Sequence, residues 1–423
     1  MTGVSARPEL TPRPVPDSSG RLWLLLTLLV AVYFSAFAAY PGLFLLVGVN
    51  HYERWFLDTF ALLASNDAVA RGLDPSLPNP LDYFHRPHVY SHWWLQLRHL
   101  GLTRAADLWL GLAVVIVFLA TALLRLRPRS LGQLAWYAVI VGCAPVLLAV
   151  DRANNDLAIF VILAGLVPVL RSNHRLIRLF VGPLLVALAA GLKYYPAAAA
   201  LLLLAGADRK ETRERMLLAG AMLVLVGFSV APDLKGFGSL APKPSGLLSF
   251  GAVTVFHELG WFGWLPKSVA LLVAGAVAAL AWRRRWLGIW QPTPAQEGDW
   301  LYFILGSVLL AGCFFTSVNF GYRWIFALWL APLLWTLPRD PATPAVVRRW
   351  ARWTARLLLL ALWWDPVWCF IYNRLAPIVP GPALRQLSQA CILAEQPFVW
   401  AFFLALIVFL AQFARERTRF VLG

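Results

Sequence analysis

Residues 131–170 read LGQLAWYAVIVGCAPVLLAV, then DRANND, then LAIFVILAGLVPVL, and this stretch decides the fold. Two apolar runs flank a hexapeptide, residues 151–156, that carries three charges and two asparagines. Long apolar runs predict helices that lie in a membrane. The whole chain agrees, because 60% of its 423 residues are hydrophobic, 14% are charged and the mean hydropathy is +0.66. This composition excludes an ordinary soluble protein and predicts an all-α, polytopic membrane protein.

We predict one transmembrane domain of about twelve spans over residues 22–423, which follows a Pro-rich cytoplasmic tail, residues 1–21, that we expect to be disordered. Several predicted spans are shorter than the roughly 20 residues that cross a bilayer, so we expect some to be tilted or broken. The predicted spans lie near residues 22–49, 106–124, 131–150, 157–170, 177–191, 195–206, 216–231, 267–282, 300–315, 324–337, 354–372 and 395–413.

The net charge of +16 could indicate a nucleic-acid partner, but the positions of the basic residues favour another explanation. With the N-terminus inside, 24 of the 37 Lys and Arg residues fall in segments predicted to be cytoplasmic. Basic residues accumulate on the cytoplasmic side of membrane proteins during insertion. We therefore predict a multi-pass protein of the plasma (inner) membrane that binds membrane lipids and no nucleic acid.

The remaining polar clusters fall on the opposite face of the predicted topology. Charged side chains at membrane depth are costly unless they pair or line a wet cavity, so their convergence indicates a functional site on the extracytoplasmic face. For any single residue, the plain alternative is an interfacial side chain in contact with water. The clusters lie at residues 51–60, 66–94, 151–156, 192–196, 255–261, 316–323 and 363–374.

The first outer loop, residues 50–105, is the longest and carries most of the acids and histidines. His85, His88 and His92 have spacings that suit a metal site on a helix, but Pro87 disfavours a regular helix and no zincin glutamate is present. We predict no metal and no other cofactor. No Ser elbow, paired Cys–His or Walker loop indicates another chemistry.

Two later turns contribute cations to the same face. In 151–156, Asn155 and Asp156 are predicted to cap the next helix, and Asp151 is predicted to orient Arg152 through a salt bridge. Lys193 could simply extend to the interface, but the helix breaker Pro196 nearby predicts a broken helix that lines a cavity.

These residue types suit one reaction in particular. A carboxylate can take a proton from a hydroxyl, and cations can stabilise a departing phosphate. Together they favour glycosyl transfer from a lipid-linked sugar phosphate, and a lipid donor explains why the site lies at a membrane face.

The order of the motifs resembles the GT-C superfamily of glycosyltransferases that depend on polyprenyl-phosphate sugars, and most of all glycosyltransferase family 87, whose members include integral-membrane mannosyltransferases. The resemblance rests on an acid soon after the first span, DRANNDLAIF, LKYYP and NFGYRWIF. It implies Asp58 as the general base, with Arg152, Lys193 and Arg323 on the donor phosphate. Three positions depart from the family pattern: Ala153 replaces a glycine, Tyr194 a leucine, and Gly321 a residue that is often acidic.

The resemblance further implies an inverting transfer of a hexose, with mannose the expected sugar, from a polyprenyl-phosphate donor to an extracytoplasmic glycolipid or glycan acceptor. The alternatives are a transporter or flippase of a lipid-linked saccharide and an O-antigen-type polymerase or ligase. The supporting or substrate-binding candidates are Asp67, Asp74, Asp82, His85, Arg86, His88, His92, Asp151, Asn154, Asn155, Asp156, Tyr194, His257, Glu258, Asn319 and Tyr322.

The four cysteines add one open point. Cys143 and Cys313 lie within predicted spans, where a small apolar side chain is ordinary. Cys369 and Cys391 flank a predicted outer loop, where a disulfide between them is possible.

Overall fold

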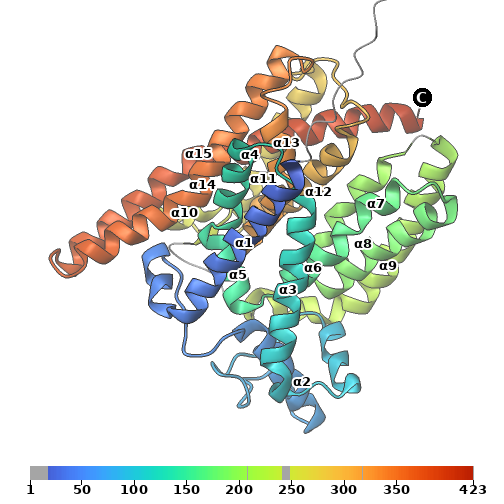
Figure 1. The fold of residues 1–423 in the computed structure, drawn as a ribbon. Helices are drawn as coiled ribbons and strands as arrows, with labels where there is room; N and C mark the ends of the chain where they lie inside the picture. Colours follow the sequence, from blue (N-terminus) through green and yellow to red (C-terminus); the bar gives the residue numbers. More distant parts are fainter. Residues whose placement is uncertain (1–17, 207, 241–247, 317, 423) are drawn as a thin grey trace, which may run out of the picture.

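The computed structural model describes residues 18–206, 208–240, 248–316 and 318–422, and these residues are almost entirely helical (Figure 1). The predicted tail lies mostly outside the described residues, and helix α1 already begins at Ser18. In the first half of the chain the helices are α1 (Ser18–Ala39), η1 (Pro41–Val47), α2 (Leu57–Ala70), η2 (His92–Leu100), η3 (Arg104–Ala106), α3 (Asp107–Arg125), α4 (Leu131–Val141), α5 (Ala144–Arg152), α6 (Asp156–Ala164), α7 (Leu166–Leu170), η4 (Ile177–Val181), α8 (Gly182–Leu192) and η5 (Tyr195–Leu204).

The second half continues with longer helices and one very small sheet. Two-residue strands β1 (Ser249–Phe250) and β2 (Asn319–Phe320) pair antiparallel, with Ser249 opposite Phe320. The helices are α9 (Arg209–Leu240), α10 (Thr254–Glu258), α11 (Trp264–Arg284), α12 (Glu297–Thr316), η6 (Gly321–Trp329), α13 (Ala331–Thr336), α14 (Ala345–Leu375) and α15 (Gly381–Leu422).

Seven helices of the described residues are long and apolar enough to cross a membrane, or eight if the bent pair α4 and α5 forms one span. The polytopic helical class is therefore confirmed, whereas the count of about twelve spans is not. The predicted segments at 157–170, 177–191 and 195–206 correspond to shorter apolar helices. The seven helices cover Ser19–Ala39, Arg104–Arg125, Arg209–Asp233, Trp264–Arg284, Glu297–Thr316, Ala345–Leu375 and Gly381–Phe420.

Glycine and proline account for the shortened helices. The α4–α5 bend of 52° falls at Gly142, with Pro145 at the start of α5. Pro196 lies at the start of η5, so the predicted break after Lys193 is confirmed. Proline lacks a backbone N–H and so favours the first turn of a helix, as at Pro145 and Pro196, although α9, α14 and α15 each continue through an internal proline. Short helices are tolerated at membrane depth where protein surrounds them.

Helix α12 forms the centre of the packed core. In the most apolar part of α12, 72% of the residues are buried, whereas in the most apolar part of α9 only 11% are buried. Aromatic rings fill the core around it: Phe314 stacks on Phe403 of α15 at 3.9 Å between ring centroids, and Phe160 stacks on Trp329 at 4.3 Å. Helix α9 instead exposes large apolar side chains such as Phe228 at 77%, which suits a surface against lipid.

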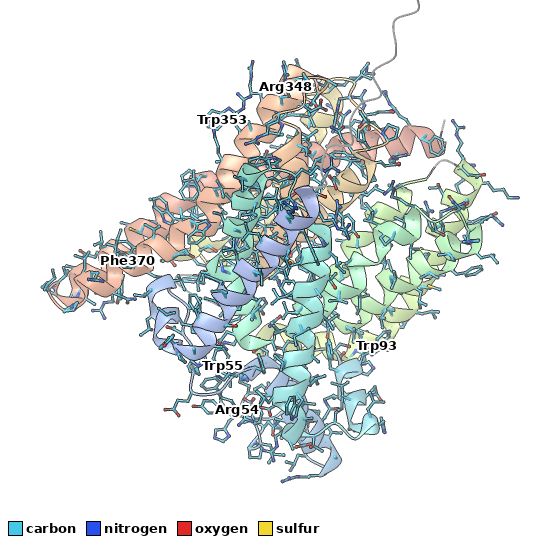
Figure 2. All side chains as sticks on the ribbon, in the orientation of Figure 1. Arg54, Trp55, Trp93, Arg348, Trp353 and Phe370 are labelled. Carbon is cyan, nitrogen blue, oxygen red and sulfur yellow. The ribbon has the colours of Figure 1, made fainter. Side chains whose placement is uncertain are left out.

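The two ends of the bundle differ in content. Helix α2 and the first outer loop lie at one end, where Arg54, Trp55 and Trp93 gather, whereas Arg348 and Trp353 lie at the other (Figures 1 and 2). The basic segments also meet at that second end, because Arg125 pairs with Asp299 and Gln296 donates to Asp340 at 2.9 Å. The separation of basic loops from the polar clusters agrees with the sequence pattern, while the end that faces the cytoplasm stays a prediction.

The turn between α5 and α6 requires an unusual backbone conformation. Ala153 has φ +40° and ψ +53°, in the left-handed region. Its N–H donates to Val150 O, and the N–H of Asn154 donates to Ala149 O, a pattern that ends a helix when the residue after it is left-handed. Glycine enters this region without the strain of a Cβ atom, which explains why a glycine would be favoured here.

Replacing Ala153 with glycine is expected to stabilise the fold. The left-handed conformation costs an L-residue roughly 1–2 kcal/mol, of which glycine's larger unfolded-state entropy cancels part, so a net gain of about 0.5 kcal/mol is expected in the free energy of unfolding. Thermal unfolding in detergent measures this change. Ala149→Gly, in buried α5 backbone only four residues away, is the control and is expected to destabilise. Equal destabilisation by both variants would contradict the strain at Ala153.

Candidate functional site

The turn between α5 and α6 is fastened to the start of α2. The N–H of Phe56 donates to Asp151 O at 2.9 Å, and the hydroxyl of Thr59 donates to Ala153 O at 2.9 Å. These two bonds join segments about 95 residues apart in sequence. As a result, Asp58 in the first turn of α2 lies against residues 151–156.

Asp58 is buried, with 7% of its surface exposed. Its Oδ2 accepts a hydrogen bond from the Asn154 side-chain amide at 2.6 Å, and its Oδ1 lies 3.5 Å from Arg86 Nη1. The contact to Arg86 is long for a charge-assisted bond, which is ordinarily below 3 Å. Asp58 is therefore held in place by an amide and has no short ion pair with any residue that the structure describes.

Lys193 extends from the break between α8 and η5 into the same cluster. Its Nζ donates to Asp156 Oδ1 at 2.5 Å and to Asn155 Oδ1 at 2.6 Å, and it lies 3.4 Å from Asn154 Oδ1. Asp156 is fully buried and Lys193 is 8% exposed. Separation of such a buried pair would leave an uncompensated buried charge, which is costly. Lys193 and Asp156 are therefore expected to stay in contact.

Arg323, in the first turn of η6, approaches the other oxygen of Asp156. Its Nε lies 3.7 Å from Asp156 Oδ2, which is an ion-pair contact too long for a hydrogen bond. Tyr195 packs between these groups, because its hydroxyl donates to Asp156 Oδ1 at 2.7 Å and its ring lies 4.8 Å from the Arg323 guanidinium. One carboxylate thus faces two cations.

Arg152 forms a neighbouring branch of the site. Its Nε lies 3.6 Å from Asp151 Oδ2, so the predicted salt bridge is confirmed, and its guanidinium lies 4.8 Å from the Tyr52 ring. Asp151 is also bound by His51 Nδ1 at 2.6 Å. His51 in turn packs against Trp55, with 4.4 Å between ring centroids. Arg152 and Asp151 are therefore positioned by side chains that precede α2.

Arg86 connects the first outer loop to this site. It donates to both oxygens of Asp82, at 2.9 and 3.0 Å, and to Leu57 O at 3.1 Å. Burial alone would raise the pKa of the Asp82 carboxyl, but the hydrogen bonds and charge of Arg86, with the backbone N–H groups of Arg86 and Phe84, bring this pKa below its ordinary value. Arg86 therefore links the loop to the start of α2 through its bond to Leu57 O, while its ion pair with Asp82 lies within the loop.

The other predicted site residues are placed outside this network. Asp67 pairs with Arg104 at 2.9 Å, and exposed Asp74 accepts from Ser76 in a local turn. His85 lies in the loop with φ +54°, while His88 contacts Ser91 O and His92 contacts Asp233.

The predicted site residues later in the chain also lie mostly elsewhere. His257 and Glu258 belong to α10, Tyr194 OH lies 3.4 Å from Asp233, and Asn319 donates to Cys313 O. Tyr322 does face the site, with its ring 5.5 Å from Lys193 Nζ.

One detail of the prediction is wrong, and the open question of a disulfide is answered. Asn155 and Asp156 do not cap α6 with their side chains; Asn154 Oδ1 instead accepts the N–H of Asp156 at 2.9 Å, while Asn155 and Asp156 are engaged by Lys193. Cys369 and Cys391, both within the described residues, are free thiols, so the possible disulfide between them does not form.

Several site residues escaped sequence analysis. Tyr195 lies in the LKYYP motif, two residues after Lys193, and His51 and Tyr52 lie in the polar cluster 51–60, but no pattern singles out any of the three. Asp233 contacts both His92 and Tyr194 from within α9. An acid inside an apolar helix is itself a signal of function, and that signal could have identified Asp233.

The network leaves buried donors without hydrogen-bond partners among the described residues. Arg152 Nε, Arg323 Nε and Asn155 Nδ2 are all in this state, as is one acceptor, Asp156 Oδ2, and the two Nε atoms lie 3.6 and 3.7 Å from carboxylate oxygens. Buried polar groups are nearly always satisfied, so three unsatisfied donors around one site indicate an acceptor-rich ligand such as a phosphate. Because the donors include two guanidinium groups, the ligand that they suit is an anion.

Acidification is expected to release the Asp82–Arg86 ion pair. The pKa of Asp82 is lower in the folded state than its ordinary 3.8, so the stability it contributes is present above that value and is lost as pH falls through the folded-state pKa. Thermal unfolding of wild type should therefore weaken below about pH 4, with this part of the pH dependence missing in Asp82→Asn. Exposed Glu53→Gln in the same loop is the control. Equal stability of Asp82→Asn and wild type at pH 7 would contradict this role.

The comparisons with known proteins add one finding. The sequence profile of glycosyltransferase family 87 matches residues 93–310, which is half of the chain and includes the turn at 151–156 and Lys193. No curated protein and no solved structure matches the chain. The family is a GT-C-type family of membrane glycosyltransferases, which agrees with the apolar helices of the fold. The chain belongs to glycosyltransferase family 87.

Proposed function

We propose that this membrane glycosyltransferase transfers a hexose, mannose in the first instance, from a polyprenyl-phosphate sugar to a glycolipid or glycan acceptor. The single observation that carries the proposal is the set of unsatisfied donors on Arg152, Arg323 and Asn155 beside a buried carboxylate without a short ion pair. A phosphate fits the donors, and an acceptor hydroxyl fits the carboxylate. The sugar, the acceptor and the extracytoplasmic orientation are parts of the proposal.

Asp58 is the general base of the proposed reaction. The other buried acids of the site have short contacts to a basic or imidazole side chain: Asp156 with Lys193, Asp151 with His51 and Asp82 with Arg86. Asp58 accepts one amide hydrogen bond and keeps Oδ1 with only a long contact. A carboxylate in this state has a free lone pair with which to accept a proton.

In the proposed reaction the acceptor hydroxyl gives its proton to Asp58 as its oxygen attacks C1 of the donor sugar. The bond between C1 and the phosphate oxygen breaks, and the electron pair leaves with the polyprenyl phosphate. Arg152, Lys193 and Arg323 stabilise the negative charge that develops there. Attack from the face opposite the phosphate inverts C1, so a β-linked donor gives an α-glycoside. The reaction needs no metal or other cofactor.

Removal of the base is expected to abolish transfer. Asp58→Asn keeps the size of the side chain and the position of Asn154, yet removes the proton acceptor, so a loss of about 10²–10⁴-fold is expected. The assay follows labelled hexose from polyprenyl-phosphate mannose, glucose and galactose into acceptor lipids, with purified protein in nanodiscs. Asp74→Asn, exposed and outside the network, is the control and should retain activity. Full activity of Asp58→Asn, or loss in Asp74→Asn, would refute the assignment.

Removal of a phosphate contact is expected to lower transfer without a change in the linkage formed. Arg152→Ala and Arg323→Ala should each cost roughly 10²–10³-fold, since each removes a donor aimed at developing charge. Exposed Arg71→Ala, at the end of α2, controls for the loss of one positive charge. Transport of an unmodified lipid-linked saccharide, or ligation of whole oligosaccharides, without hexose transfer would favour the alternative functions.

A further inference from the structure

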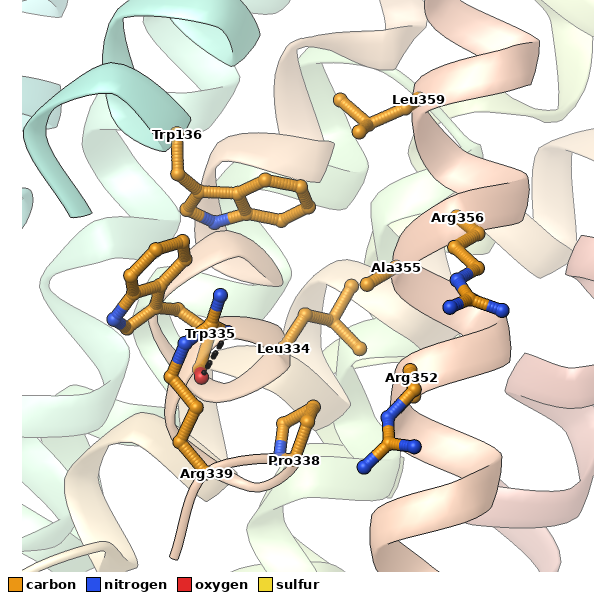
Figure 3. Close-up of a pocket in the computed structure, with 9 residues that line it drawn as sticks. All are labelled: Trp136, Leu334, Trp335, Pro338, Arg339, Arg352, Ala355, Arg356 and Leu359. Carbon is orange, nitrogen blue, oxygen red and sulfur yellow. Dashed lines mark hydrogen bonds between the residues drawn. The ribbon is translucent and has the colours of Figure 1, made fainter. Parts of the chain in front are cut away.

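A second site lies at the opposite end of the bundle, between α4, α13 and the N-terminal half of α14. It is a groove of about 470 Å³ (Figure 3). The groove is far from Asp58 along the fold, because η6 starts at Gly321, two residues before Arg323 of the candidate site, and the chain reaches the groove only in α13. The residues that line it are Trp136, Leu334, Trp335, Pro338, Arg339, Arg352, Ala355, Arg356 and Leu359.

The walls of the groove are apolar and firmly placed. Trp136 Nε1 donates to Ala331 O at 2.9 Å, which fixes the indole against α13, and the Trp136 and Trp335 rings lie 6.2 Å apart. Leu359 and Ala355 form the facing wall on α14. Walls of this kind suit a hydrocarbon chain and offer little to a soluble ion.

The open end of the groove carries three arginines. In Figure 3, Arg352 and Arg356 project from α14 on one side and Arg339 lies on the other, beside Trp335. The Arg339 guanidinium stacks 3.3 Å from the Trp335 ring centroid and donates to Trp335 O at 3.0 Å, so its position is fixed. Within the described parts of the chain, none of the three forms an ion pair with a carboxylate.

The arginines also repel one another. Burial lowers the pKa of Arg339 and the like charge of Arg352 lowers it further, so the two guanidinium groups influence each other directly. A bound anion would offset the repulsion between neighbouring arginines that have no carboxylate partner. The planar guanidinium group can donate two hydrogen bonds to the oxygens of one phosphate. The groove is thus apolar inside and strongly cationic at its opening.

We propose that this groove binds one anionic phospholipid of the membrane, with an acyl chain between Trp136 and Leu359 and the headgroup phosphate on Arg339, Arg352 and Arg356. Neighbouring residues on the outside of the bundle agree, because Trp353 is 55% exposed and Leu360 is 47% exposed, as expected of a surface against lipid. Basic pockets between membrane helices suit such headgroups. The proposal is independent of the reaction at Asp58.

Lipid titration of the full-length protein tests the proposal. Native mass spectrometry in detergent would measure binding of phosphatidylglycerol and of phosphatidylcholine with the same acyl chains. Wild type should bind phosphatidylglycerol more tightly. In the variant Arg339→Gln/Arg352→Gln/Arg356→Gln this preference should fall by about 5-fold for each arginine, or on the order of 100-fold in all. The matched control Arg127→Gln/Arg284→Gln/Arg349→Gln removes three exposed arginines that do not line the groove and should keep the preference.

A second variant separates the chain site from the charge site and remains informative if the triple variant does not fold. Ala355→Phe fills the groove and leaves all three arginines, so it should weaken binding of phosphatidylglycerol and not of inorganic phosphate. Equal loss in the control triple variant, or unchanged binding in Ala355→Phe, would overturn the proposal. Displacement of phosphatidylglycerol by inorganic phosphate at equal concentration would also overturn it, in favour of a soluble-anion site.

Discussion

The rest of the site depends on the buried pair between Lys193 and Asp156. The Asp156 carboxylate is fully buried and accepts from Lys193 at 2.5 Å and from Tyr195 at 2.7 Å, while Arg323 lies 3.7 Å away. Two cations face the Asp156 carboxylate, and the neighbouring buried carboxylate of Asp58 adds a second negative charge to the cluster. This mutual pairing of charges offsets the cost of their desolvation.

The breaks between short helices bring these side chains together in one part of the bundle. Helices α6, η5 and η6 all begin at the site, at Asp156, Tyr195 and Gly321. The start of a helix carries unsatisfied N–H groups and a partial positive charge, so three such ends add to the attraction for an anion. Uninterrupted spans would carry those ends to the membrane surface. The breaks that reduce the number of full-length spans are therefore part of how the site is built.

Sequence patterns predicted the class of fold and the residues of the principal cluster, but not which side chains contact one another. Asp58, Arg152, Lys193 and Arg323 stand out because charged groups are rare among apolar runs, and they do lie together. The count of about twelve spans is not confirmed, because it includes the apolar runs at 157–170, 177–191 and 195–206, which form shorter helices. The role of His51 depends on a contact with Asp151, 100 residues away, that no local pattern contains. Local patterns identify charged residues, and tertiary packing decides their partners.

Packing explains the glycine at 321, a position where the resemblance implies that an acid is frequent. A Cβ atom at this position would lie 2.5 Å from Leu248 O, which already accepts the N–H of Gly321. Leu248 is itself held by Asp365, whose Oδ2 accepts the Leu248 N–H at 2.6 Å. An acidic side chain cannot enter without moving this backbone, because the atom it meets is a carbonyl and not a flexible side chain. In this chain, then, the backbone carbonyl of Leu248 occupies the space next to Gly321, and Asp365 supplies the carboxylate that holds Leu248.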